Sequence, residues 1–156
     1  MKTMLTLLAI TALTFMGYGQ QAMTFTEAEA NGIHIPHLDS MYKSGVHVDS
    51  SRAVFHNRQE EYFTAYYTLL QDLGVFLQAN NFYWDNPTRS FNRIYFDKTG
   101  KIDYFLYNFS PGQLTIAQEK EFKALVNKFI IDYRFALTAE VDFAQCSPVK
   151  YTPANK

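Results

Sequence analysis

Residues 91–109, FNRIYFDKTGKIDYFLYNF, contain the pattern that decides the fold. Two stretches rich in aromatic residues flank the tetrapeptide DKTG, in which Asp97 holds the first turn position and Gly100 the fourth. This chemistry is typical of a type I turn that continues into a glycine bulge, because Gly100 can take a positive φ without a steric penalty. The sequence therefore predicts a β-hairpin with a three-residue loop.

The loop length sets the register of the hairpin, with Asp97 opposite Lys101 and Phe96 opposite Ile102. Alternation of side chains then predicts two faces. One face is core-like and collects Asn92, Ile94 and Phe96 with Ile102, Tyr104 and Leu106. The other face mixes rings with charges and collects Phe91, Arg93 and Tyr95 with Asp103, Phe105 and Tyr107.

Apolar residues spaced three and four apart predict two amphipathic helices, over about 58–79 and 116–132. Capping pairs are expected at their starts, with Asn57 and Glu60 for the first and Thr115 and Gln118 for the second.

Two further extended pieces are expected. Residues 82–84, Phe-Tyr-Trp, form a short one, and Val141–Cys146 form a final strand that Pro148 either confines to a sheet edge or ends. The order of elements predicts an α+β fold, with an antiparallel sheet built on the hairpin 91–109 plus the C-terminal strand and packed by the two helices.

The first 19 residues have the features of a secretory signal peptide. Lys2 charges the n-region, an apolar run follows over 5–16, and Gly17 and Gly19 place small residues before Gln20. A run of about a dozen residues is too short to span a bilayer, which needs about 20. We expect cleavage after Gly19 and a periplasmic or secreted protein that has no membrane span after cleavage.

The balance of charged residues excludes some classes of binding partner. The chain has 14 basic and 15 acidic residues, so no net charge draws it to nucleic acid or to an anionic membrane.

After the signal peptide 1–19, we expect an irregular lead segment over 20–50, a single α+β domain over 51–152 and a loose tail over 153–156.

Residues with metal-binding or nucleophilic chemistry are few. Cys146 is the one cysteine, so it is buried and inert, free, or paired with another molecule. His34, His37 and His47 are ligand types, but Pro36 makes their segment extended and does not place the rings on one helical face. These histidines are secondary metal candidates, and no cofactor is expected.

Aromatic residues make up 17% of the chain, and ten of them fall within residues 82–109. Two helices cover one face of a sheet, so we expect some rings to remain exposed, and an exposed apolar patch marks a binding site. The candidate ligand-binding residues are Trp84, Arg93, Tyr95, Phe105 and Tyr107.

Residues 91–151 resemble the C-terminal module of TonB-type energy transducers. The resemblance lies in the order strand, DKTGKI turn (97–102), strand, helix, Tyr133-Arg134-Phe135 and final strand. The chain lacks the Ser-Ser-Gly step after the hairpin and the proline after the Arg-Phe pair. The resemblance implies a periplasmic module that accepts a partner peptide strand along a sheet edge.

These features favour an exported, non-enzymatic binding module that contacts a peptide, protein or glycan through an aromatic sheet face or a sheet edge. No Walker loop, GxSxG, HExxH or dinucleotide fingerprint occurs. The alternatives are a small extracytoplasmic hydrolase or metal-binding protein that uses His34, His37 and His47, a carboxylate or Cys146, and a structural component of the cell envelope.

Overall fold

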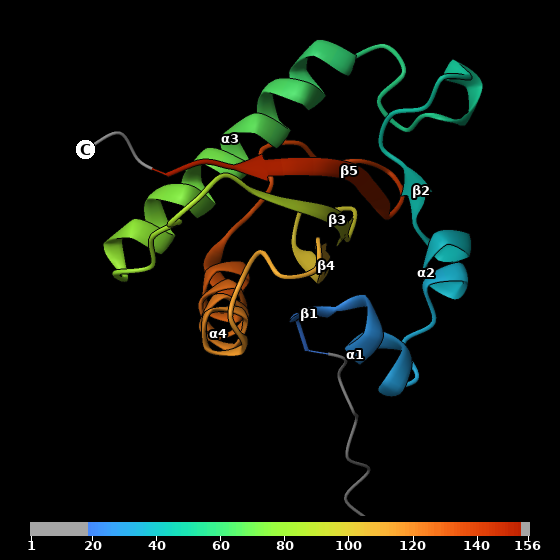
Figure 1. The fold of residues 1–156 in the computed structure, drawn as a ribbon. Helices are drawn as coiled ribbons and strands as arrows, with labels where there is room; N and C mark the ends of the chain where they lie inside the picture. The colour runs from blue at the N-terminus through green and yellow to red at the C-terminus, as the bar shows by residue number, and fades with distance from the viewer. Residues whose placement is uncertain (1–18, 154–156) are drawn as a thin grey trace, which may run out of the picture.

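The computed structural model describes residues 19–153, so the predicted leader (except Gly19) and the last three residues lie outside it. Its five strands form one mixed sheet in the order β1-β4-β3-β5-β2, with helices on both sides (Figure 1). The elements in chain order are β1 (Gln21–Thr24), α1 (Phe25–Ala30), α2 (Ile35–Met41), β2 (Lys43–Ser44), a 3-10 turn (Ser50–Arg52), α3 (Gln59–Ala79), β3 (Thr88–Phe96), β4 (Ile102–Phe109), α4 (Ile116–Asp132) and β5 (Phe143–Tyr151).

The predicted hairpin and its turn are confirmed. Strands β3 and β4 pair antiparallel with Phe96 opposite Ile102, and the Asp97 amide donates to the Lys101 carbonyl at 2.9 Å. Gly100 has a φ of 85°, as the turn requires. The Asp97 carboxylate accepts hydrogen bonds from the backbone amides of Thr99 and Lys101, which fixes the loop.

The predicted assignment of β4 side chains to faces is wrong, because a β-bulge interrupts the hairpin. The register shifts between Tyr95 and Phe96, so that Tyr95 lies opposite Tyr104 and Ile94 opposite Phe105. An extra residue in one strand turns every later side chain to the other face. Phe105 therefore lies on the face that the sequence assigned to Tyr104.

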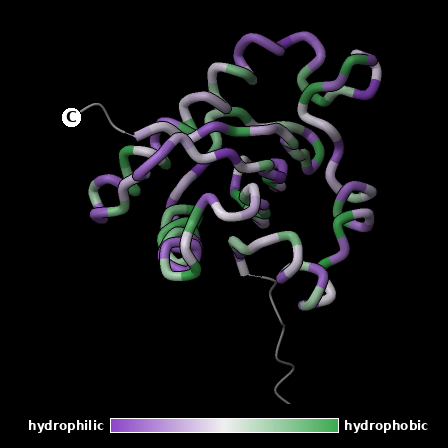
Figure 2. Tube along the Cα trace, in the orientation of Figure 1, coloured by the Kyte–Doolittle hydropathy of each residue, from purple (hydrophilic) through white to green (hydrophobic). Residues whose placement is uncertain are grey.

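The two long helices are confirmed, and α4 has the predicted bounds. Thr115 and Gln118 form the expected reciprocal capping box at its start. The predicted cap of α3 is wrong, since its N-cap residue is Arg58 and no side chain caps it. Figure 2 shows hydrophobic and hydrophilic residues alternating around α4, the pattern of a helix with one buried face. The expected extended piece at 82–84 is not a strand.

The lead segment 20–50 is not irregular, because it contributes two strands and two short helices. Strand β1 pairs parallel with β4, and β2 pairs parallel with β5, so the sheet is mixed rather than antiparallel. These elements have two to seven residues each, which is too short for a period to be recognised. A signal for α1 was nevertheless present, since Thr24 and Glu27 form a capping box.

Both faces of the sheet are covered. The larger hydrophobic cluster packs α3 and α4 against one face, around Phe96, Phe105 and Phe143. The smaller cluster packs α1 and α2 against the opposite face, around Tyr95 and Leu106. Figure 1 shows the two helix layers on either side of the strands.

One hydroxyl in the larger cluster has no partner within residues 19–153. Tyr62 is fully buried and its hydroxyl lies against Gly45, where a Cβ atom would collide with the ring. The neighbouring Tyr66 hydroxyl, one helical turn further on, bonds to the Ser147 hydroxyl at 2.6 Å. The two tyrosines are therefore a matched pair, one unsatisfied and one satisfied.

We expect Tyr62→Phe to raise the free energy of unfolding by about 1 kcal/mol, because a buried hydroxyl without a partner is destabilising. Tyr66→Phe, the control, should lower it by about 1 kcal/mol because it removes a hydrogen bond. Urea denaturation measures both changes. Equal losses in the two variants would show that the Tyr62 hydroxyl is satisfied.

Candidate binding site at the margin of the sheet

The five candidate residues of the aromatic patch do not share an exposed surface. Phe105 and Tyr107 are buried under the long helices, and Tyr95 is buried under α2. Trp84 is half-buried and its ring stacks on Tyr151, with centroids 4.5 Å apart. Arg93 is partly exposed. The expected aromatic patch is thus corrected: within the described residues these rings are packing residues. Helix α2 covers Tyr95, and the bulge in the hairpin turns Phe105 and Tyr107 toward α3 and α4.

The β1 margin of the sheet is closed by side chains. The side-chain amide of Asn127, on α4, accepts a hydrogen bond from the Ala22 amide and donates one to the Ala22 carbonyl, both at 2.9 Å. The Thr24 amide donates to the Glu27 carboxylate. These side chains stand where a further strand would lie, so this margin offers no free backbone groups at Ala22 and Thr24.

The opposite margin is closed over only part of its length. Strand β2 pairs with Phe143 and Ala144 of the nine-residue β5, and Gly45 adds one more bond from its amide to the Ala144 carbonyl. The outer side of β2 is itself bonded, since the Val54 amide donates to the Ser44 carbonyl. After Gly45 the chain turns away, and β5 continues along the margin with a neighbour on one side only (Figure 1).

The backbone groups of this open part of β5 can be assigned by alternation. The Ala144 carbonyl points away from β3, so the backbone groups of Cys146, Pro148 and Lys150 point the same way. Within residues 19–153 none of these groups has a backbone partner. Pro148 lies where its missing N–H would face outward, in agreement with the alternative that it confines the strand to an edge. The other alternative, that it ends the strand, is wrong, because β5 continues to Tyr151.

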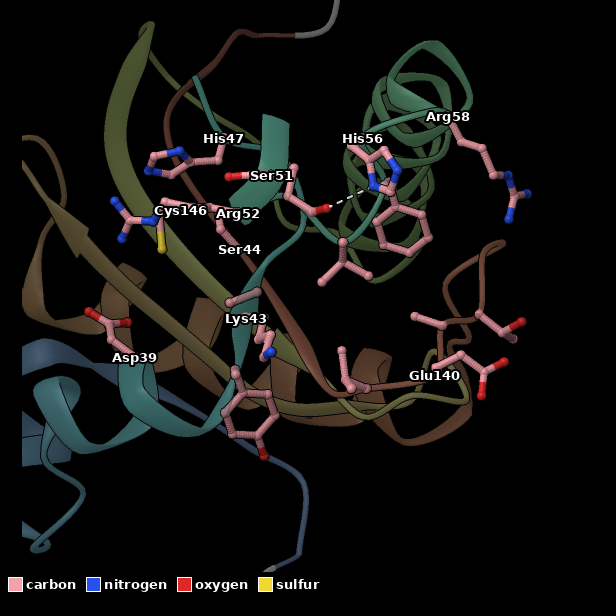
Figure 3. A pocket seen from close by; sticks show the side chains of 18 of the residues that line it. Asp39, Lys43, Ser44, His47, Ser51, Arg52, His56, Arg58, Glu140 and Cys146 are labelled. Carbon is pink, nitrogen blue, oxygen red and sulfur yellow. Dashed lines mark hydrogen bonds between the residues drawn. The ribbon is translucent and has the colours of Figure 1, made fainter. Parts of the chain in front are cut away.

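A cleft of about 1050 Å³ adjoins this margin and surrounds β2. Figure 3 shows His47 and Cys146 on one side of the chain that crosses the cleft, and His56 and Arg58 on the other. The charged and histidine side chains that line it are Asp39, Lys43, His47, Arg52, His56, Arg58, Arg93 and Glu140. Polar and apolar groups thus share a volume in the range of ligand-binding clefts.

A hydrogen-bonded group at the cleft joins α2 to the sheet. The Asp39 carboxylate accepts bonds from Arg93 at 2.6 Å and from the Tyr95 hydroxyl at 2.9 Å. Burial lowers the pKa of the Arg93 guanidinium, but the hydrogen bonds with Tyr95 and Asp39 raise it by more. The pKa is therefore above its ordinary value. Asp39 therefore holds Arg93 in place beside Cys146, its cross-strand neighbour.

Cys146 is an exposed free thiol, which is one of the three states that the sequence left open. Partial desolvation raises the pKa of the thiol, with Arg93 opposing this change and Asp39 adding to it. No hydrogen bond joins Cys146 to a histidine in the described part of the chain. A raised pKa keeps the sulfur in the poorly nucleophilic thiol form, so this environment does not suit a catalytic cysteine.

Two like charges lie opposite each other at the far end of the open margin. Arg89 and Lys150 are directly paired across β3 and β5, so their side chains project from the same face. Both residues are exposed, and neither has an ion pair within residues 19–153. Like charges in this position are destabilising unless an anion lies over them.

The histidines that the sequence singled out do not come together. His34 pairs with Glu29 at 2.7 Å, and it lines a smaller hollow of about 380 Å³ with His37. His47 instead lines the larger cleft, where its ring accepts a bond from the Asp49 amide. No group of three or more metal-ligating side chains is found between residues 19 and 153.

Comparison with known proteins finds no matching family profile, curated protein or solved structure. No helix of the described chain has the length and apolar character needed to cross a membrane.

Several residues of this site were missed by sequence reasoning. Asp39 and Lys43 lie in the segment taken as irregular, and Arg89 and Lys150 are brought together only by the pairing of β3 with β5. Of the five candidate ligand-binding residues only Arg93 lines the cleft, together with the metal candidate His47 and with Cys146. Both residues lie outside the predicted strands, since the hairpin is expected to begin at Phe91 and the final strand to end at Cys146, whereas β3 begins at Thr88 and β5 ends at Tyr151.

We expect Asp39→Asn to increase the rate of Cys146 alkylation by iodoacetamide at pH 8 several-fold. The carboxylate holds the pKa of the thiol up and neutralises Arg93, so its loss increases the thiolate fraction. Asp85→Asn, which changes the same charge on an exposed loop away from the cleft, is the control. An unchanged rate in Asp39→Asn would show that Asp39 does not act on the thiol.

Proposed function

We propose that this chain is an exported, non-enzymatic binding module that accepts an extended peptide along the outer edge of β5. The observation that carries the proposal is the mismatch between β2 and β5, because two residues of β2 cover a strand of nine. An edge with unpaired amides and carbonyls pairs readily with another strand.

The geometry limits what this edge can take. Cys146 and Lys150 each offer an amide and a carbonyl, and Pro148 offers a carbonyl only. The proline removes one donor and makes long, unspecific pairing unfavourable, which is how natural sheets avoid aggregation through their edges. A short peptide that enters beside the cleft fits these limits.

A peptide is favoured over a glycan because the edge presents backbone groups at the spacing of a β-strand. A second strand satisfies them in regular order, whereas a sugar chain has no matching series of amides. The aromatic sheet face that the sequence predicts as a binding surface is not part of this proposal, since Tyr95, Phe105 and Tyr107 are buried.

The experiment selects peptides from a phage-displayed library of random dodecapeptides on the purified protein. We expect the selected peptides to protect Cys146 from alkylation and to slow amide exchange at Cys146 and Lys150. Lys150→Pro, which removes an outward amide, should weaken binding at least about tenfold, because the hydrogen bond is lost and the ring obstructs the approach.

Lys150→Ala is the matched control, since it removes the same charge and keeps the amide. Val149→Pro removes an amide that points toward β3 and is expected to destabilise the sheet itself. Equal affinity of the selected peptides for Lys150→Pro and Lys150→Ala would rule out the β5 edge as the binding site. Unchanged labelling of Cys146 in their presence would rule it out as well.

Export is tested separately. Strand β1 begins at Gln21, two residues after the expected cleavage position, so removal of residues 1–19 leaves every described strand and helix intact. We expect the mass of the protein recovered from a bacterial host with a secretion system to correspond to a chain that begins at Gln20. An intact N-terminus at Met1 would contradict export by this route.

A further inference from the structure

Positive charge gathers where the proposed peptide would lie. Four cations and two histidines line the cleft with two carboxylates, although the whole chain carries a net charge of −1. The cations are Lys43, Arg52, Arg58 and Arg93, and the carboxylates are Asp39 and Glu140. The charged side chains that line the cleft are therefore mostly basic, on a molecule that is slightly acidic.

Part of this charge is already neutralised within the chain. Asp39 pairs with Arg93 at 2.6 Å, and Glu61 pairs with Arg58 at 2.7 Å. Arg52 lies near Asp49, whose carboxylate bonds chiefly to Ser51. Lys43 has no ion pair among the described residues. With Glu140 counted as well, four carboxylates face the four cations of the cleft, so the cleft itself keeps no net positive charge.

The second concentration of charge is the pair Arg89 and Lys150, described above as lying directly opposite across two strands. Nothing in the described chain neutralises either side chain. Their juxtaposition is unfavourable in the unbound protein, and an anionic group placed over both would remove the repulsion.

We infer that the peptide accepted at this margin is acidic, with a carboxylate over Arg89 and Lys150, two cations that no described residue neutralises. This inference rests on the proposed function, since it assumes that the ligand is a strand beside β5. It adds the chemical class of the ligand and the register in which it binds.

The probes are three synthetic nine-residue peptides of alternating threonine and valine. One carries glutamate at its fifth position, and the others carry glutamine or lysine at the same position. We expect the glutamate peptide to bind about tenfold more tightly than the glutamine peptide at low salt. The advantage should largely disappear at about 0.5 M salt, where the Debye length is about 4 Å.

Arg89→Glu tests the location of the charge. The substitution places opposite charges across β3 and β5, so the sheet is retained while the positive field over Lys150 is removed. We expect the preference for the glutamate peptide to fall at least about fivefold in this variant. Lys120→Glu, the same charge change on the exposed surface of α4, is the control and should keep the preference.

The outcomes separate this inference from the function on which it rests. Library-selected peptides that bind at β5, together with a glutamine peptide that binds as tightly as the glutamate peptide, would support the proposed binding edge. The same result would overturn the inference that the ligand is acidic. A preference that survives Arg89→Glu, or binding by none of the three peptides, also overturns the acidic ligand. If the library yields no peptide that protects Cys146, the proposed function fails as well.

Discussion

The sheet has two margins, and the backbone groups at these margins are satisfied in different ways. At β1 the side chains of Asn127 and Glu27 occupy the hydrogen bonds that a further strand would make. At β5 the two residues of strand β2 pair with Phe143 and Ala144, and the chain turns away from the sheet after Gly45. Buried sheet interiors require every amide and carbonyl to be paired, so the backbone groups of the described chain that can still pair with another strand lie at the margin that is not completed.

The packing beneath Gly45, where the chain leaves the margin, admits no side chain. The Tyr62 ring fills the space under Gly45 and contacts Phe55 and Phe143, with ring centroids 4.9 and 6.4 Å away. No residue with a Cβ atom fits over the ring without movement. The larger hydrophobic cluster therefore requires glycine at the last position that bonds to β5.

The N-terminal segment has two effects on the surface. Helices α1 and α2 bury Tyr95 and Tyr104, which would otherwise form an apolar face, and Asp39 of α2 orients Arg93 toward the margin. The face that stays accessible is therefore charged rather than aromatic. This change in chemistry moves the expected ligand from one recognised by stacking to one recognised by backbone pairing and charge.

The sequence by itself determined the hairpin, its turn and both long helices, because each depends on contacts between residues close in the chain: Asp97 and Gly100 in the loop, Thr115 and Gln118 at the start of α4. For Pro148 it left two alternatives, a sheet edge or the end of the strand, and the continuation of β5 to Tyr151 decided between them. Only the tertiary structure decided which rings are buried and where charge gathers. A single bulge exchanged the faces of β4. The parallel pairing of β1 with β4, and of β2 with β5, joined residues more than 80 positions apart. Such pairings depend on the packing of the whole chain, which local periodicity does not encode.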